Sequence, residues 1–466
     1  MLKSKVKKCN ECKKKRKLVN EIHQICHLCY KAKTANRSGN NVIDEFIKST
    51  LSNCHAKAKL EFVPYDRFED IEFVAEGGFS KIYKATWIDG PLSTKWNNEK
   101  KGFEHLGKMT VALKELNNSK NIDSKELNEL KIFYNFILKK SLFYINEYYG
   151  ITQNPITQNF IIITNYYQSG DLAHYISNNF FKISWRIKLE KLQDMIYGLS
   201  DLHNANIIHQ DYHSGNIFNL ESKYRFEASA ITGDFGISKS AIQSSDDDKE
   251  VYGIIPYIAP EVFQGQKYTK ASDIYSFGMI MWELMTGRRP FWDKSHDTDL
   301  IIEICDGLRP SIVTNAPEGY IELMQKCWHT DPNERPNASD VQNEFVGFSS
   351  KLNYLNERRN PTKIIYSPDI GPIAINNPGA IYKSRPLSAM IKSANFTKSL
   401  RLKCLSIASG IDKRKFNNNL IENNNKDKIV KKLKYCENEN DDYLTKELEF
   451  DIDDCQNSNK FNNNGN

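Results

Sequence analysis

The sequence predicts an α+β protein in which a strand-rich part precedes a helical part, with a small cysteine-rich module in front of both. Three observations predict this order. Short apolar strands begin at Asp66, an apolar helix covers Ile274–Leu284, and two CxxC pairs lie within the first 36 residues. The helix should end at Thr286-Gly287, since glycine commonly closes helices, and its apolar stretch is too short to cross a membrane.

The two CxxC pairs predict a zinc site in residues 1–36. Each CxxC turn directs two thiolates toward one point, and four thiolates complete a tetrahedral shell around Zn²⁺. Thirteen residues separate the pairs, which are Cys9, Cys12, Cys26 and Cys29. A segment this short buries too little core to fold alone, so the metal would supply folding free energy. The alternative is a disordered leader with unmetallated cysteines; His23 and His27 could also replace one thiolate.

A basic block accompanies these cysteines. Residues 1–37 hold twelve Lys or Arg against two acidic residues, with Lys13–Lys17 as the densest run. The block could be a nuclear-import signal, a phosphate contact or a solvated loop, and the solvated loop is favoured. Because no aromatic side chains interleave with these cations, nucleic acid is not an expected partner.

Composition predicts a cytoplasmic protein, with the nucleus as an alternative. The start, Lys3 to Lys8, leads into more charge and does not resemble a signal peptide. The longest apolar runs fall far short of a membrane span. In a reducing compartment the ten cysteines would be free thiols or metal ligands.

A hairpin is expected at residues 71–84, around the turn Gly77-Gly78. Glycines let backbone N–H groups approach a phosphate closely because no Cβ intervenes. The polar stretch 87–108 follows and is assigned as an insertion before the strand that carries Lys114. Such an insertion costs little, since closure entropy rises only logarithmically with loop length.

Four short motifs follow in a fixed order over about 150 residues. They are Val111-Ala112-Leu113-Lys114, His209-Gln210-Asp211-Tyr212-His213-Ser214-Gly215-Asn216, Asp234-Phe235-Gly236 and Ala259-Pro260-Glu261. Together they resemble the eukaryotic protein-kinase family over residues 66–348, and the string from His213 to Asn216 resembles its tyrosine-kinase-like branch. The resemblance implies a two-lobed fold, with a small β-rich lobe and a larger helical lobe.

The resemblance also implies the catalytic roles. Asp211 resembles the base that orients and accepts the proton of a substrate hydroxyl, while Asn216 and Asp234 resemble the ligands of Mg²⁺ or Mn²⁺. Lys114 resembles the lysine that holds the α- and β-phosphates of ATP. Its partner would be a glutamate on the next helix, and Glu129 is preferred to Glu126.

The remaining nucleotide contacts are assigned from the same resemblance. The glycine-rich loop carries glycines at its middle positions, while Ala75 and Ser80 stand where the family usually has its first and third glycines. Thr164 resembles the residue that gates the back pocket, and Asp171 resembles the group near the ribose. The full predicted set is Val74, Gly77, Gly78, Ile82, Ala112, Lys114, Thr164, Asn165, Tyr167, Asp171 and Phe218.

Structural roles are implied for a further group. Glu261 and Arg335 resemble a buried ion pair in the helical lobe, and Asp273 resembles the helix residue that anchors the catalytic loop. His209 is expected to support that loop by hydrogen bonding.

Three departures bear on regulation and substrate. Gln210 replaces an arginine that in relatives pairs with an activation-loop phosphate, so the cation that would bind this phosphate is missing here. His213 and Ile254 stand where many Ser/Thr kinases have lysine and threonine. We favour Ser/Thr phosphorylation of protein substrates and keep dual specificity open. The alternative function is a pseudokinase scaffold that binds nucleotide and partners without phosphoryl transfer.

The outer segments are assigned by composition. Residues 37–65 are predicted as a linker and 349–466 as a mostly disordered tail rich in Asn and Lys. Within the tail, residues 364–386 could dock on the kinase or on a partner, and the N-terminal module could also bind a regulatory partner. The layout of CxxC pair, Ser38–Ile47, Val63–Phe68 and kinase domain resembles the expanded kinase-like families of arbuscular mycorrhizal fungi.

Overall fold

The computed structural model describes most of the chain before residue 415. Contacts divide the chain into one compact unit, Met1–Cys404, and a second, Leu405–Asn466; the features below belong to the first. The described residues are 6–20, 24–53, 59–78, 80–97, 102–122, 127–139, 143–220, 230–236, 238–240, 250–313, 316–351 and 368–414.

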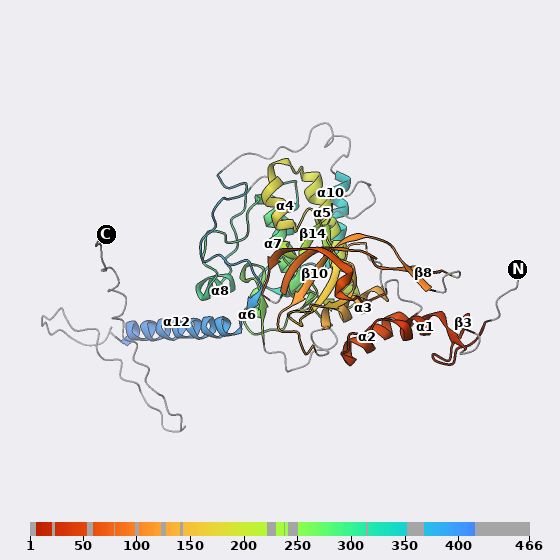
Figure 1. The fold of residues 1–466 in the computed structure, drawn as a ribbon. Helices are drawn as coiled ribbons and strands as arrows, with labels where there is room; N and C mark the ends of the chain where they lie inside the picture. The colour runs from red at the N-terminus through yellow and green to blue at the C-terminus, as the bar shows by residue number, and fades with distance from the viewer. Residues whose placement is uncertain are drawn as a thin grey trace, which may run out of the picture. The chain divides into compact units, whose positions relative to one another are not determined.

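Strands and helices are separated along the chain, with most strands before residue 166 and most helices after it (Figure 1). The strands are β1 (Lys7–Lys8), β2 (Lys15–Arg16), β3 (Leu18–Asn20), β4 (Ile25–Cys26), β5 (Glu61–Phe62), β6 (Phe68–Glu76), β7 (Ser80–Trp87), β8 (Leu92–Asn97), β9 (Gly102–His105), β10 (Met109–Leu116), β11 (Tyr148–Gln153), β12 (Phe160–Asn165), β13 (Ile207–Ile208), β14 (Ile217–Asn219), β15 (Ala230–Thr232), β16 (Lys239–Ser240), β17 (Tyr252–Gly253) and β18 (Arg385–Pro386). The helices are α1 (His27–Thr34), α2 (Asn41–Ser52), α3 (Asn128–Ile137), α4 (Leu172–Asn179), α5 (Trp185–Asn204), α6 (Pro260–Phe263), α7 (Lys270–Thr286), α8 (Thr298–Cys305), α9 (Tyr320–Cys327), α10 (Ala338–Lys351) and α12 (Ser388–Arg414).

The strand-rich lobe is one sheet in the order β5-β11-β12-β10-β7-β6, and the predicted hairpin is its pair β6–β7. Side chains of a strand alternate between its two faces. In β10, Val111 and Leu113 are buried in the apolar cluster on one face, while Ala112 and Lys114 lie on the other. The alternation therefore places the predicted lysine on the face that borders the cavity between the lobes.

The helical lobe is built on α5 and α7, which share one large apolar cluster. Helix α7 is buried over nearly its whole length, and it ends at Gly287 in the left-handed conformation with φ 75°, as predicted from Thr286-Gly287. Its N-terminus carries a capping box between Thr269 and Ser272. Among the described residues, no helix is both long enough and apolar enough to span a membrane.

The segment predicted as a linker, 37–65, contains helix α2. Asn40 caps this helix by accepting from the backbone N–H groups of Val42 and Ile43. Ile43, Ile47 and Leu51 follow at four-residue spacing and are buried in the apolar cluster that also contains residues of α3. The composition of the segment suggested a connector, but this apolar stripe makes it part of the strand-rich lobe.

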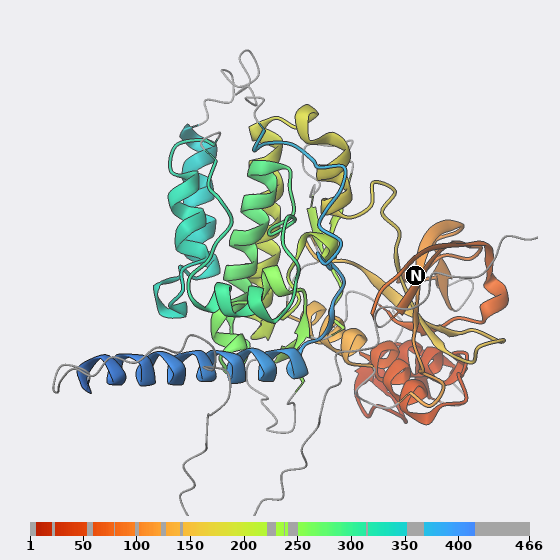
Figure 2. The same ribbon diagram turned by 90° about the vertical axis from the view of Figure 1, so that its left-hand side faces the viewer.

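The insertion at 87–108 lies between β7 and β10 and forms the hairpin β8–β9, which projects from the sheet (Figure 1). The tail predicted as mostly disordered contains an ordered part, because residues 368–401 pack on the helical lobe (Figure 2). This part includes the described portion of the segment 364–386. Residues 352–367 and 415–466 lie outside the description.

Lys188 of α5 is buried without a hydrogen-bond partner among the described residues. Its side chain is 0% exposed, and its Nζ lies 3.9 Å from the Phe180 ring centroid and 4.9 Å from that of Trp185. Burial lowers the pKa of Lys188 from 10.5 to about 7. The unfolded chain therefore holds more protons between pH 7 and 10.5, and stability rises with pH over this window.

We expect Lys188→Met to raise the free energy of unfolding by about 1–3 kcal/mol at pH 6.5, with a smaller gain at pH 9. Urea titrations at both pH values measure this. Lys191→Met on the same helix is the matched control, because Lys191 Nζ donates to Asn219 Oδ1 and its loss should destabilise. A Lys188→Met gain that does not change with pH would contradict a buried, titrating lysine.

Candidate active site

Lys114, Glu129 and Asp234 form an ion triad at the back of the cavity. Lys114 Nζ, on β10, donates to Glu129 Oε2 of α3 at 2.9 Å and to Asp234 Oδ1 at 2.6 Å. Tyr148 of β11 donates its hydroxyl to Glu129 Oε1 at 2.7 Å, a contact that no sequence motif predicts. Of the two candidate glutamates, Glu129 makes the pair; Glu126 lies outside the described residues.

Burial and the neighbouring charges shift the pKa values of the triad in opposing directions. Burial alone would lower the pKa of Lys114, but the carboxylates of Asp234 and Glu129 outweigh it and raise that pKa. Burial would raise the pKa of Asp234, but Lys114 outweighs it and leaves that pKa below its usual value. Burial and the Asp234 charge raise the pKa of Glu129 against the opposing effect of Lys114. A cation is thus fixed between two carboxylates on one wall of the cavity.

The loop that carries Asp211 is anchored by Asp273 of α7. Asp273 Oδ2 accepts from His203 Nε2 and from the backbone N–H of His209, both at 2.9 Å, and Oδ1 accepts from Gln210 N at 3.0 Å. His209 is fully buried, which lowers its pKa, and its Nε2 donates to the Gly233 carbonyl at 3.0 Å. His209 therefore supports the loop as a neutral hydrogen-bonding group, as predicted.

Asp211 and Asn216 lie together at the end of this loop. Asn216 Nδ2 donates to the Asp211 carbonyl at 2.9 Å. His213 Nδ1 accepts from Gly215 N at 3.1 Å, so the proton of the neutral ring lies on Nε2, which is 3.4 Å from Asp211 Oδ1. His213 thus presents an N–H group to the Asp211 carboxylate.

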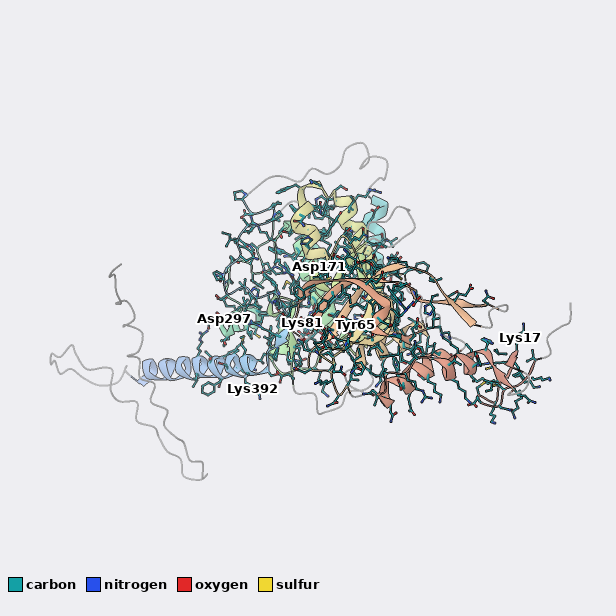
Figure 3. All side chains as sticks on the ribbon, in the orientation of Figure 1. Lys17, Tyr65, Lys81, Asp171, Asp297 and Lys392 are labelled. Atoms are coloured by element: carbon teal, nitrogen blue, oxygen red, sulfur yellow. The ribbon has the colours of Figure 1, made fainter. Side chains whose placement is uncertain are left out.

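A cavity of about 980 Å³ lies between the lobes and collects most of the predicted nucleotide contacts. Tyr167 stacks on Phe218 with ring centroids 5.0 Å apart, and Thr164 lies buried at the end of β12. Asp171 lies at the start of α4, where its Oδ1 accepts from His174 N at 2.8 Å (Figure 3). The predicted residues that line this cavity are Val74, Gly77, Ile82, Ala112, Lys114, Glu129, Thr164, Asn165, Tyr167, Asp171, Asn216, Phe218 and Asp234.

Gly78 and Asp211 line a second cavity, of about 390 Å³, that adjoins the first. Lys114, Asn216 and Asp234 border both. The lining of the second cavity also includes Tyr382, Lys383 and Ser384 of the tail. The predicted catalytic residues thus lie where the two cavities meet.

The oxygens near this junction fit a hard divalent cation. Hydrogen bonds to Asp234 converge on Oδ1, from Lys114 and from Gly236 N, which leaves Oδ2 without a hydrogen bond among the described residues. Asn216 uses its Nδ2 as a donor, so its Oδ1 remains an acceptor beside Asp234. Carboxylate and amide oxygens are the ligands that Mg²⁺ prefers.

A family model described as "protein tyrosine and serine/threonine kinase" matches residues 68–345. This span includes both lobes, the triad and the loop around Asp211. The chain belongs to this kinase family. Within the matched residues, the structure has the two-lobed arrangement that the motifs predict.

Curated relatives match over the same region. The chain is 28% identical over 283 residues to a probable serine/threonine-protein kinase of Dictyostelium discoideum, and the match covers 58% of this chain and 14% of the relative. It is 28% identical over 305 residues to the probable serine/threonine-protein kinase pats1 of the same organism, covering 62% and 9%. A putative serine/threonine-protein kinase/receptor of Acanthamoeba polyphaga mimivirus is 30% identical over 260 residues, covering 54% and 15%. The kinase domain thus spans a small part of these longer proteins.

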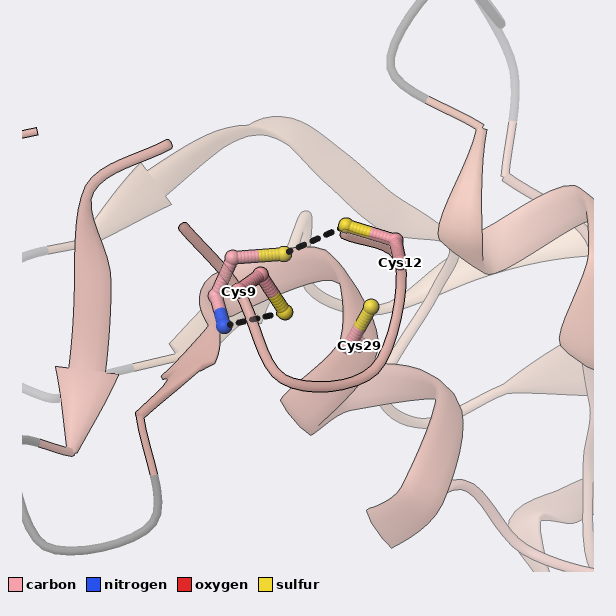
Figure 4. Close-up of side chains that lie close together, drawn as sticks. Cys9, Cys12 and Cys29 are labelled. Carbon is pink, nitrogen blue, oxygen red and sulfur yellow. Dashed lines mark hydrogen bonds between the residues drawn. The ribbon is translucent and has the colours of Figure 1, made fainter. Parts of the chain in front are cut away.

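Outside the kinase domain, four cysteines converge in the N-terminal module (Figure 4). The Sγ atoms of Cys9, Cys12, Cys26 and Cys29 all lie within 4.8 Å of one another. The turn after β1 supplies the first pair, and the junction of β4 with α1 supplies the second. None of these cysteines is in a disulfide.

The geometry of this cluster fits zinc. A tetrahedron with Zn–S bonds of about 2.3 Å has sulfur–sulfur edges of roughly 3.8 Å, and the Cys12 and Cys26 sulfurs are 3.8 Å apart. Cys26 N donates to Cys9 Sγ at 3.2 Å (Figure 4). Burial would raise the pKa of Cys9, but backbone N–H donors outweigh it and lower that pKa to about 6, whereas burial and the neighbouring thiols raise the pKa of Cys29. The fit to zinc therefore rests on the positions of the four sulfurs.

Proposed function

We propose that this chain transfers the γ-phosphate of MgATP to a serine or threonine hydroxyl of protein substrates. The observation that carries the proposal is the meeting of two groups at one junction: the triad of Lys114, Glu129 and Asp234, and the pair Asp211 and Asn216. Phosphoryl transfer depends mainly on positioning and on neutralising charge, and this junction offers a fixed cation, metal-ligand oxygens and a base.

Each group has one part in the reaction. Lys114 would hold phosphate oxygens of ATP, with Glu129 and Tyr148 fixing its position. Asp234 and Asn216 would hold Mg²⁺, which neutralises the charge on the transferring phosphate. Asp211 would orient the substrate hydroxyl and accept its proton.

The second candidate is a pseudokinase scaffold. The altered glycine-rich loop favours it, since Ala75 and Ser80 stand at two of the three usual glycine positions. The presence of Lys114, Asp211, Asn216 and Asp234 together favours transfer, because a scaffold needs neither Asp211 nor the metal-ligand oxygens.

Transfer of labelled γ-phosphate from MgATP to a generic basic protein tests the proposal, with Asp211→Asn as the control. We expect labelled phosphoserine or phosphothreonine that disappears in the variant. Label on tyrosine as well would show that the kinase has dual specificity. MgATP binding by the native chain, without transfer either to the basic protein or to the chain itself, would establish the scaffold function instead.

The N-terminal module is proposed to hold structural Zn²⁺ through Cys9, Cys12, Cys26 and Cys29. The convergence of four sulfurs and the 3.8 Å sulfur–sulfur distance support this. A small module with little core would depend on the metal for its folding free energy.

We expect purified chain to contain about one Zn²⁺ and to lose it on replacement of Cys9 and Cys26 by alanine. Elemental analysis measures the metal, and hydrogen exchange over residues 6–34 measures the order that it maintains. Cys305→Ala is the matched control, because Cys305 lies half-buried in the helical lobe, far from the cluster in sequence. Equal metal content in the two variants would refute the site.

Two broader assignments stay predictions. The similarity to the kinase-like families of arbuscular mycorrhizal fungi rests on the sequence layout, and it implies signalling without naming a substrate. Cytoplasmic localisation rests on composition.

A further inference from the structure

The tail segment Ile381–Ser388 lies across the mouth of the active site. Its side chain at Ser384 points into the second cavity, where the hydroxyl donates to Asp211 Oδ2 at 2.5 Å. His213 Nε2 lies 3.4 Å from the same hydroxyl oxygen. A serine hydroxyl thus occupies the position in which Asp211 would receive the proton of a phosphoacceptor.

The backbone on the C-terminal side of Ser384 is held as an added strand. Strand β18 pairs antiparallel with β17 in the register Gly253↔Arg385 and Tyr252↔Pro386. Leu387 N donates to the Val251 carbonyl at 2.8 Å, and Val251 N donates to Ser388 Oγ at 2.8 Å. Pairing of an extended segment with an exposed edge is a common mode of peptide recognition, since main-chain bonds give affinity and side chains give specificity.

Side chains on both sides of Ser384 fill defined positions. Leu387 is 1% exposed in the large apolar cluster of the helical lobe. Arg385 Nη2 donates to the His296 carbonyl at 2.7 Å. On the N-terminal side, Tyr382 donates its hydroxyl to the Pro290 carbonyl at 2.9 Å and packs edge-on against the His296 ring.

The glycine-rich loop also meets this segment. A Cβ on Gly78 would lie 2.4 Å from the Ser384 carbonyl oxygen, which is closer than atoms can pack. The absence of a side chain at Gly78 therefore lets the loop cover the serine. This contact is a reason for that glycine besides the approach of a phosphate.

Beyond the active site, α12 secures the tail to the helical lobe. Ile391 and Ala394 are buried in its apolar cluster, and Asn395 Nδ2 donates to the Phe263 carbonyl at 3.1 Å. In Figure 3, the label Lys392 marks α12 and the label Asp297 marks the start of α8. Two surface ion pairs also hold α12 in place. Lys398 pairs with Asp306, directly after α8, at 2.6 Å, and Arg401 pairs with Asp299 of α8 at 3.0 Å.

We propose that Ser384 is an intramolecular phosphorylation site and that residues 381–388 occupy the acceptor groove as a built-in substrate. This inference rests on the proposed kinase function. It also predicts the class of external substrate. This is an extended peptide in which arginine directly follows the acceptor serine and a large apolar residue stands three positions after that serine.

The reaction balances with ATP as the only co-reactant. A bond forms between Ser384 Oγ and the γ-phosphorus, and the bond from that phosphorus to the β–γ bridging oxygen breaks. The proton of the hydroxyl passes to Asp211, and ADP leaves. The phosphoserine would place about two negative charges beside Asp211 and Asp234, so repulsion should release the tail and open the groove.

The test incubates the full chain with MgATP and maps phosphate by mass spectrometry. We expect phosphate on Ser384, none in Asp211→Asn, and none on Ser388, whose hydroxyl bonds the backbone of Val251. The first-order rate constant should stay the same over a hundredfold range of chain concentration. A rate that rises with concentration would refute an intramolecular reaction.

Leu387→Asp removes the anchor, because a carboxylate cannot enter the apolar cluster without a partner. It should slow Ser384 phosphorylation by about tenfold or more and speed transfer to an added basic protein several-fold. Leu400→Asp is the matched control, since Leu400 on α12 is 45% exposed, and it should change neither rate. Arg385→Ala, which removes only the bond to the His296 carbonyl, should shift both rates in the same directions by less.

The two levels of the proposal fail differently. Transfer to the basic protein by Leu387→Asp, with no phosphate on Ser384 in the native chain, would refute the built-in substrate and leave the kinase function standing. Absence of transfer to every acceptor in every variant, with MgATP bound, would refute both.

Discussion

Asp234→Asn is expected to lower phosphoryl transfer by roughly a thousandfold or more while the fold is retained. The substitution removes the charge that pairs with Lys114 and a carboxylate oxygen that would hold Mg²⁺. Because Lys114 keeps Glu129 as a partner, the buried cation is not left alone. Single-turnover transfer measures the loss, and thermal unfolding measures the fold.

The pH dependence of this pair follows from the direction of the Asp234 shift. Its folded pKa lies below the usual value of an aspartate, so its contribution to stability is fully present above that usual value. The contribution is lost as pH falls through the lowered pKa. Native chain and Asp234→Asn should therefore differ in stability at neutral pH and converge in strong acid.

Asp66→Asn is the matched control, since Asp66 is exposed at the edge of the strand-rich lobe. It should leave transfer within about twofold of the native rate, because exposed substitutions away from a site rarely matter. Transfer by Asp234→Asn within tenfold of the native rate would contradict the role assigned to its carboxylate.

The parts of the site that the sequence predicted are those fixed by short spacing. Lys114 and the motif from His209 to Asn216 are local patterns, and strand alternation or a tight loop is enough to place their side chains. The resemblance supplied the longer links, from Lys114 to Glu129 and from Asp273 to the loop around Asp211, and both pairs are in contact in the structure.

The parts that the sequence did not predict depend on contacts between distant segments. The sequence predicts a linker at the position of α2, because Ile43, Ile47 and Leu51 indicate a packed helix only when the apolar cluster that they share with α3 is known. Ser384 lies 173 residues beyond Asp211, and nothing local marks it as the serine that reaches the base. The sequence left open whether residues 364–386 dock on the kinase or on a partner. The apolar site that buries Leu387 forms only in the folded helical lobe.

The hydrogen-bond partners of individual side chains also could not be predicted from the sequence. Tyr148 donates to Glu129, and Ser238 is buried with its hydroxyl donating to the His209 carbonyl. A strand or loop pattern gives the direction of a side chain but does not give its partner. These contacts could be found only in three dimensions.

Arg335→Leu is expected to lower the free energy of unfolding by about 3–5 kcal/mol. Arg335 is fully buried and donates from Nη1 and Nη2 to the two carboxylate oxygens of Glu261, each at 2.7 Å. Its Nε also donates to the His329 carbonyl at 2.8 Å. The substitution leaves the Glu261 charge buried without its partner, which is the costly way to break such a pair.

Arg67→Leu is the matched control, because Arg67 makes the same two-bond contact with Asp89 at 2.7 and 2.6 Å. Both side chains of that pair are more than 30% exposed, at 39% and 32%, so water replaces the lost bonds and the expected cost is below about 1 kcal/mol. Denaturant titrations of the two variants measure the difference. Combining Arg335→Leu with Glu261→Leu should recover part of the loss, since the unpaired charge is removed with its partner. Equal costs for the two arginines would show that burial does not set the strength of the Glu261 pair.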